Sequence, residues 1–163
     1  TLIMMLLFTT AFAASPSFRT QTLTALVEMF DDHSEIRFSG TTNGAETHKM
    51  SILWMPDGYQ IGLEEFDESR MIIRADGENG ENLDVAATAI SKNRSYSFDT
   101  EGAIEESAMV QNNEAGVYQM KTEKGDKITV LWTDMEKGWI VRVTGYNISK
   151  EDMLRISESV EIR

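Results

Sequence analysis

The feature that most constrains the fold of this chain is a regular alternation of short apolar segments with turn residues. From residue 51 to residue 144 the apolar segments recur roughly every ten residues, a spacing typical of antiparallel strands joined by hairpins. Turn formers such as Asp76-Gly77 and Lys124-Gly125 separate them. The expected strands are residues 35–38, 51–54, 59–65, 71–75, 83–90, 96–99, 105–110, 116–122, 128–133 and 139–144. The pattern predicts a curved antiparallel sheet arranged as a meander.

The end of the chain carries the clearest local signal. In residues 128–133 and 139–144 apolar and other side chains alternate, so each strand presents one apolar face to a common core. Ser149 is the expected N-cap of a final helix, and Asp152 follows three residues later as in a capping box. The expected buried residues of this helix are Met153, Ile156 and Val160. We expect the helix to cover one face of the sheet.

The beginning of the chain is apolar and uncharged from Leu2 to Ala14. A spanning helix needs about 20 apolar residues and a signal-peptide core about 7 to 15. Ala11-Phe12-Ala13 has the small-x-small form of a signal-peptidase site. A membrane anchor is favoured over a cleaved signal, and a buried helix of a soluble protein is a third reading. We expect residues 1–14 to end a transmembrane or signal segment and residues 15–163 to form a single extracytoplasmic α+β domain.

A second helix is predicted directly after the apolar segment. Ser15 is a candidate N-cap with Pro16 at the first helical position. Leu23, Leu26, Val27 and Phe30 then recur at helical spacing, and the helix is expected to end near Asp31. The predicted fold class is therefore α+β, with a curved antiparallel sheet packed by an N-terminal and a C-terminal helix and preceded by a truncated membrane helix.

Charge and cysteine content exclude several classes of function. The chain has 27 acidic and 15 basic residues, for a net charge of −12, which repels nucleic-acid phosphates. There is no cysteine, which excludes disulfides, thiolate zinc sites and cysteine nucleophiles.

Residues suited to catalysis or metal binding do not form a recognisable arrangement. His33, at the predicted helix end, and His48, in a polar loop, are expected to be surface residues. The segment 76–82 resembles a calcium loop, but Gly80 stands where the third ligand is needed, so a hairpin tip is the better interpretation. Adjacent acids such as Glu64 and Glu65 point to opposite faces of a strand. We predict no catalytic, cofactor-binding or metal-binding residues and therefore no enzyme.

The segment Trp54-Met55-Pro56-Asp57-Gly58-Tyr59 resembles the motif that opens a domain family of unknown function, number four-three-six-seven. The ending is similar as well, with an aromatic strand, a strand ending in glycine and a following helix. Residues 13–19 resemble the usual passage of this family out of a membrane helix. The signature residues, to which the resemblance assigns a structural role, are Trp54, Pro56, Gly58, Tyr59, Trp132, Gly145 and Ser149.

The resemblance implies a single-pass membrane protein of the Firmicutes type, with this domain outside the cytoplasm. Some members of the family are regulators similar to anti-sigma factors, and some carry the domain beside lipoprotein-carrier-like modules. The family supplies no catalytic residues and no cofactor. The implied partners are the membrane, through the N-terminal helix, and a cell-envelope protein or small ligand.

Two functions follow as expectations. The first is a membrane-tethered sensor or regulatory domain that binds a cell-envelope partner and transmits a signal through the N-terminal helix. The second is a carrier or binding module for a lipid or peptide, secreted or anchored, with an apolar surface formed by Trp54, Tyr59, Trp132 and Trp139. Simple core packing is the alternative role for these aromatic residues.

Overall fold

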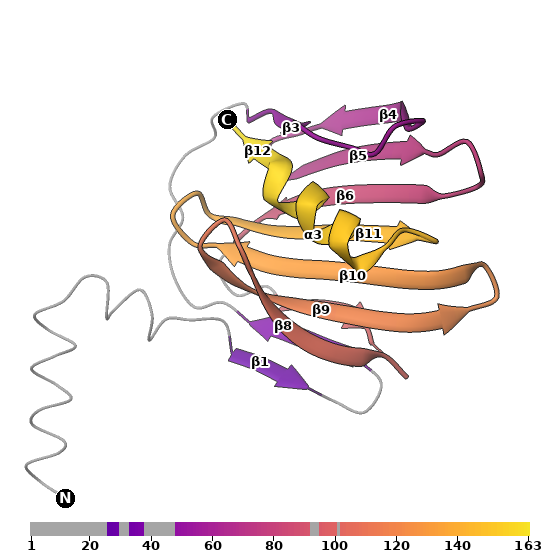
Figure 1. Ribbon diagram of the computed structural model, residues 1–163. Helices are drawn as coiled ribbons and strands as arrows, with labels where there is room; N and C mark the ends of the chain where they lie inside the picture. Colours follow the sequence, from indigo (N-terminus) through magenta and orange to yellow (C-terminus); the bar gives the residue numbers. More distant parts are fainter. Residues whose placement is uncertain (1–25, 30–32, 38–47, 92–94, 101) are drawn as a thin grey trace, which may run out of the picture. The chain divides into compact units, whose positions relative to one another are not determined.

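The computed structural model describes residues 26–29, 33–37, 48–91, 95–100 and 102–163, which fall into two compact units. The first unit comprises residues 1–42 and 91–99, and the second comprises residues 43–90 and 100–163. Figure 1 shows the elements of both units along the chain.

The first unit contains a three-stranded antiparallel sheet. Its strands are β1 (Leu26–Met29), β2 (His33–Arg37) and β7 (Ser95–Asp99), in the order β1-β2-β7. Leu26 pairs with Arg37 across β1 and β2, and His33 pairs with Asp99 across β2 and β7. Strands expected at 35–38 and 96–99 are therefore confirmed.

The prediction of a helix that ends near Asp31 is wrong for Leu26–Met29, because these residues form strand β1. The apolar positions 26 and 27 fit a helix by spacing, but a short apolar run also fits a strand. Pairing with β2 supplies backbone hydrogen bonds that periodicity cannot reveal. His33 consequently begins a strand and does not end a helix. The remainder of the predicted helix and the membrane segment lie outside the described residues.

The second unit is built on a seven-stranded antiparallel sheet with the order β4-β5-β6-β11-β10-β9-β8. The strands are β4 (Gln60–Phe66), β5 (Arg70–Asp76), β6 (Asn82–Ala89), β8 (Ile104–Val110), β9 (Asn113–Thr122), β10 (Gly125–Asp134) and β11 (Trp139–Tyr146). Each predicted strand from 59–65 onward in this unit is found, with ends that differ by a few residues.

The order of the strands corrects the prediction of one simple meander. Strands β4 to β6 form one meander and β8 to β11 form another. The two are joined by antiparallel pairing of β6 with β11, from Tyr146 opposite Asn82 to Trp139 opposite Ala89. This junction connects segments distant in sequence, so local patterns give no sign of it (Figure 1).

One face of the seven-stranded sheet forms the core of this unit. Val85, Val143, Val130 and Val117 lie opposite one another in a row across four strands, and all are fully buried. Large buried residues from both meanders flank this row, among them Met71, Ile73, Leu83, Val141 and Trp139.

Helix α3 (Lys150–Ser159) covers this face, with Met153 and Ile156 fully buried against the strands (Figure 1). The predicted helix, its Ser149 N-cap and these two buried residues are thus confirmed. No helix among the described residues is long and apolar enough to cross a membrane.

The chain turns back into a strand directly after α3. Val160, predicted on the buried stripe of the helix, instead begins β12 (Val160–Ile162), which pairs with β3 (Met50–Ile52) in a separate two-stranded sheet. The expected strand 51–54 is therefore shorter than predicted, and Trp54 lies beyond it. Val160 is β-branched and buried, so it serves the core equally well from an extended backbone.

Gly145 allows α3 to approach β11 closely. A Cβ atom at this position would lie 2.7 Å from Ile148 Cδ1 and closer still to Met153 Sδ. Met153 is fully buried, so its side chain has little room to move. The absence of a side chain at residue 145 is therefore a requirement of helix packing.

We predict that Gly145→Ala lowers the free energy of unfolding by about 1–3 kcal/mol, because it overpacks the contact between α3 and the sheet. Urea unfolding followed by circular dichroism measures this change. Gly62→Ala is the matched control, since its nearest neighbour would be Asp76 Oδ2 at 3.8 Å. Equal stability of the two variants would contradict the packing role of Gly145.

Candidate functional site

The signature residues gather around α3. The segment 53–59 follows β3 and runs beside the helix, from its C-terminal end at Ser159 toward its first turn at Asp152. Leu53 N–H donates to the carbonyl of Ser159 at 3.0 Å, and Ser159 Oγ donates to the carbonyl of Trp54 at 3.0 Å. These hydrogen bonds fix the start of the segment to the end of the helix.

Trp54 attaches the middle of the helix to the same segment. Its ring lies 3.9 Å from the guanidinium carbon of Arg155, measured to the ring centroid, which is a cation–π contact. Trp54 also packs against the core from a half-buried position. Arg155 therefore covers one face of the Trp54 indole.

Gly58 and Tyr59 complete the segment near the start of the helix. Gly58 has a φ of +88°, a left-handed conformation that glycine adopts without a steric penalty. Burial raises the pKa of Tyr59 to about 12, and the negative charges of Glu81 and Asp152 contribute further. The phenol of Tyr59 therefore lies in a partly desolvated, acidic environment beside the first turn of α3.

Ser149 organises that first turn. Its hydroxyl accepts a hydrogen bond from Asp152 N–H at 3.1 Å and donates to Asp152 Oδ2 at 2.7 Å. The carboxylate also lies at the positive end of the helix dipole. Ser149 thus caps α3, while Trp54 and Gly145 lie where the helix meets the rest of the domain.

The other end of α3 is held by the turn between β8 and β9. Gln111 and Asn112 both have positive φ, as a two-residue type I′ turn requires. The backbone N–H of Gln111 donates to both carboxylate oxygens of Glu158 at 3.1 Å. Its side-chain amide donates to the carbonyls of Ser157, Glu158 and Val160. Gln111 thus adds a donor at the helix end, where the Ser157 carbonyl also accepts from the Val160 N–H.

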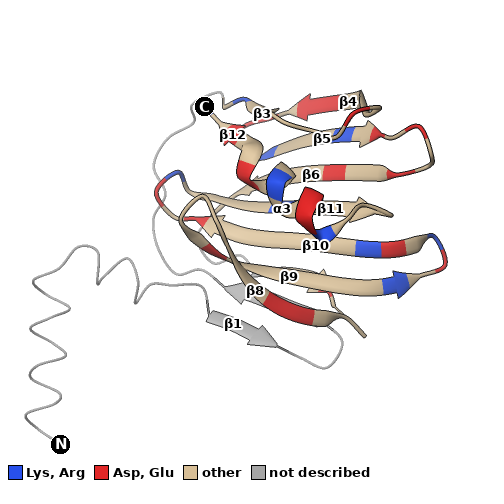
Figure 2. Ribbon diagram, viewed as in Figure 1, with Lys and Arg blue, Asp and Glu red and all other residues tan. Residues whose placement is uncertain are grey.

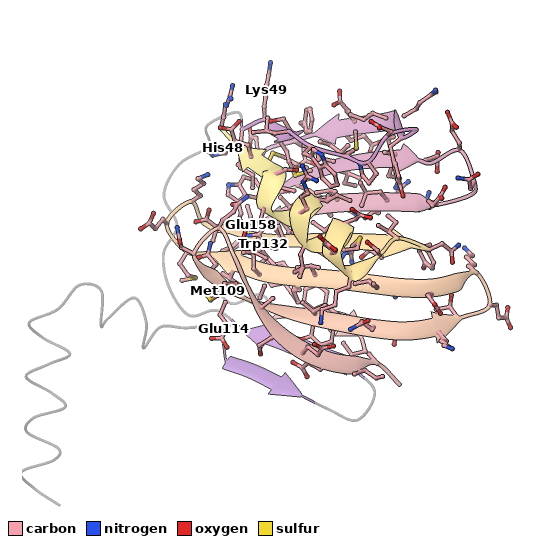
Figure 3. The ribbon with its side chains drawn as sticks, in the orientation of Figure 1. His48, Lys49, Met109, Glu114, Trp132 and Glu158 are labelled. Carbon is pink, nitrogen blue, oxygen red and sulfur yellow. The ribbon has the colours of Figure 1, made fainter. Side chains whose placement is uncertain are left out.

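Trp132 and Trp139 lie in the core, with only 2% of each side chain exposed. Their indole N–H groups have no hydrogen-bond acceptor among the described residues. Figure 3 labels Trp132 of β10 together with Met109 of β8 and Glu114 of β9. Of the four aromatic residues predicted to form an apolar ligand surface, these two are therefore not accessible from outside.

His48 was expected to be a surface residue of a polar loop, but it is half-buried. Its ring packs edge-on against Trp139 with a centroid distance of 5.3 Å and an interplanar angle of 81°. This contact reveals a packing role that the polar residues around His48 in the sequence obscured. Among the described residues, no three acidic or histidine side chains come together as a metal site would need.

The opposite face of the sheet carries an ion-pair cluster. Asp84 accepts from Arg74 Nε at 2.8 Å and from Arg142 Nη2 at 3.4 Å. The bond to Asp84 raises the pKa of Arg74. Asp84 partly neutralises the positive charge of both arginines. We interpret the three residues as structural ion pairs on the surface of the sheet.

The arrangement described so far defines a class of domain, a seven-stranded antiparallel sheet closed on one face by a docked helix. The chain belongs to the family described as domain of unknown function (DUF4367), which it matches over residues 49–160. The matched range contains all seven signature residues and ends at the first residue of β12. Comparison with curated proteins and with solved structures found no match.

We predict that Gln111→Gly lowers the free energy of unfolding in urea by roughly 1–2 kcal/mol, since it removes the amide that links the β8–β9 turn to the end of α3. Glycine keeps the positive φ, so the turn itself is not strained. Asn112→Gly changes the neighbouring turn residue and should have little effect. A similar loss in both variants would mean that the turn, and not the amide of Gln111, supports α3.

A pH-dependent contact joins α3 to strand β8. Lys150 Nζ lies 2.5 Å from Glu106 Oε2, and this pair holds the pKa of Glu106 below its usual range. The lowered pKa means that the pair stabilises the folded state above the ordinary carboxylate pKa and that this contribution is lost as pH falls through the folded pKa.

We predict that Lys150→Met raises the pKa of Glu106 toward the ordinary glutamate value. A carbon-detected NMR titration of the side-chain carboxyl measures this shift directly. The same titration of Glu105, its neighbour in β8, serves as an internal control. An unchanged pKa of Glu106 in the variant would show that Lys150 does not hold this carboxylate in solution.

Proposed function

We propose that this chain is a membrane-tethered extracytoplasmic regulatory domain, similar to those of anti-sigma factors, which acts by binding a cell-envelope protein and not by catalysis. The apolar residues 2–14 supply the tether, and the folded residues bind the partner on the outer side of the membrane.

One observation favours this role over that of a carrier. Of the four aromatic residues that could line an apolar site, Trp132 and Trp139 are almost fully buried and Trp54 is covered on one side by Arg155. A lipid or peptide carrier needs such side chains to be available to its ligand. Here the aromatic residues hold the helix and the core, and the charged outer surface is left for recognition of another protein.

The carrier alternative would require the helix to separate from the sheet. That movement would break the packing of Met153 beside Gly145 and the hydrogen bonds of Gln111 to the end of α3. Since each contact depends on a helix position set by the others, opening would cost several of them together. The docked helix therefore favours a domain that recognises partners from its outer surface.

We expect the native protein to remain in the membrane fraction after alkaline extraction, and protease added from outside to digest the region after residue 48. An apolar run of this kind resists extraction because its transfer to water is unfavourable. Immunoblotting with an antibody to the C-terminal residues measures both properties.

A mass that shows an uncleaved N-terminus, together with digestion of the domain by protease from outside, would agree with the tethered role. Cleavage after Ala13 with release of a soluble domain would remove the physical route for signalling and would contradict the proposal. A cytoplasmic protein probed in the same sample controls for broken cells.

A further inference from the structure

The seven-stranded sheet has two edges, β4 and β8, and each pairs with one neighbour only among the described strands. An edge strand presents backbone N–H and C=O groups that another extended segment can pair with. The two edges differ in whether they permit such pairing.

Strand β4 has features that prevent another strand from pairing along it. Its register with β5 shifts between Ile61 and Leu63, which marks a bulge. Glu64 and Glu65 follow, and Asp67 and Glu68 lie just beyond its end, so negative charge is concentrated there (Figure 2). Bulges and charges are the usual protection of an exposed edge.

Strand β8 has no such irregularity. It pairs with β9 without interruption from Ile104 opposite Gln119 to Val110 opposite Asn113. Ile104 and Met109 are 68% and 63% exposed, far above the other apolar residues of the edge. A strand without a bulge and with exposed apolar side chains is a surface on which an added strand gains buried area.

The register of β8 identifies the backbone groups that face outward. Val110 and Asn113 flank the two-residue turn, and such residues exchange hydrogen bonds with each other. Bonded and non-bonded pairs then alternate along an antiparallel ladder. The N–H and C=O groups of Glu105, Ser107 and Met109 therefore point away from β9.

Side chains beside this edge differ between its two faces. On the face that α3 covers, Ile104 and Ala108 are apolar, and Glu106 is already engaged by Lys150 and by Gln119 Nε2 at 2.8 Å. On the opposite face, Glu105 has no ion-pair partner among the residues that the structure describes, and Glu114 is exposed opposite Met109. The available negative charge thus lies on one face, together with Met109, whereas Ile104 and Ala108 lie on the other.

We propose that β8 binds an extended segment of the partner protein in which cationic and apolar residues alternate. Strand geometry places the cationic residues beside Glu105 and the apolar residues beside Ile104 and Ala108. This inference rests on the proposed protein-binding role and names the surface that performs it. A second copy of the chain is a poorer occupant, because two chains of net charge −12 repel each other.

The test uses the whole chain in nonionic detergent micelles and an acetylated, amidated octapeptide of alternating lysine and valine. Isothermal titration measures the Kd of this peptide and of its glutamate and valine counterpart. We expect the cationic peptide to bind, the acidic one not to bind, and the affinity to fall as salt is added.

Ser107→Pro is the decisive variant, because it removes an outward N–H and leaves the hydrogen bonds to β9 in place. We expect it to weaken binding by about tenfold, since at least one intermolecular hydrogen bond is lost and its neighbours are displaced. Ser107→Ala controls for the side chain. Glu64→Pro is the matched control on the other edge, where the bond from Asp67 N–H to the Arg70 carbonyl sets the same alternation.

Glu105→Lys tests the charge without touching the backbone, and it keeps the test decisive if Ser107→Pro does not fold. We expect this variant to bind the cationic peptide more weakly and the acidic peptide more tightly. No binding of the cationic peptide, equal binding of both peptides, or equal effects of the two proline variants would overturn the proposal. Sedimentation showing a dimer that Ser107→Pro dissociates would also overturn it, because the occupant would then be a second copy.

These outcomes are separable from those of the membrane test. Failure of peptide binding in a protein that is tethered and accessible from outside would leave the regulatory role standing and remove only this surface. Peptide binding by a protein that is cleaved and released would preserve the surface and remove the tethered role.

Discussion

The pairing of β6 with β11 is the constraint on which the rest of the second unit depends. Each meander could form from neighbouring hairpins, and only this pairing joins the two into one seven-stranded sheet. The register that places Val85 opposite Val143 aligns the buried rows of both halves. This pairing joins residues far apart in the chain, so the loop-closure entropy must be overcome before the core can form.

Once the two halves are aligned, the helix position follows from a few short-range contacts. Gly145 in β11 admits Met153, Ser149 begins the helix, and Gln111 in the turn after β8 holds its end. Contacts to α3 thus come from β11 and from the turn after β8, the two outer strands of the β8–β11 meander. Three of the signature residues, Trp54, Gly145 and Ser149, thus lie at the contacts and the cap that position α3.

Local pattern was sufficient wherever the relevant contact is also local. The strands of the second unit, the hairpin at 76–82 and the Ser149 cap were predicted from alternation, turn residues and capping chemistry, and the structure confirms them. Local pattern was insufficient where a residue distant in sequence determines the structure. Strand β1, the place of β11 beside β6, the contact of His48 with Trp139 and the amide of Gln111 at the helix end all depend on residues from elsewhere in the chain.

The acidity of the chain bears on how an open edge can persist without aggregation. Strand β4 is protected by its own bulge and charges, whereas β8 has no bulge and carries exposed apolar residues. Copies that approach along β8 repel each other through their net charge of −12, and the free carboxylate of Glu105 adds to this repulsion at close range. A cationic segment is attracted by the same field. Net charge can thus discourage self-association while β8 remains able to pair with a partner of opposite sign, so the domain has no need of a second bulge.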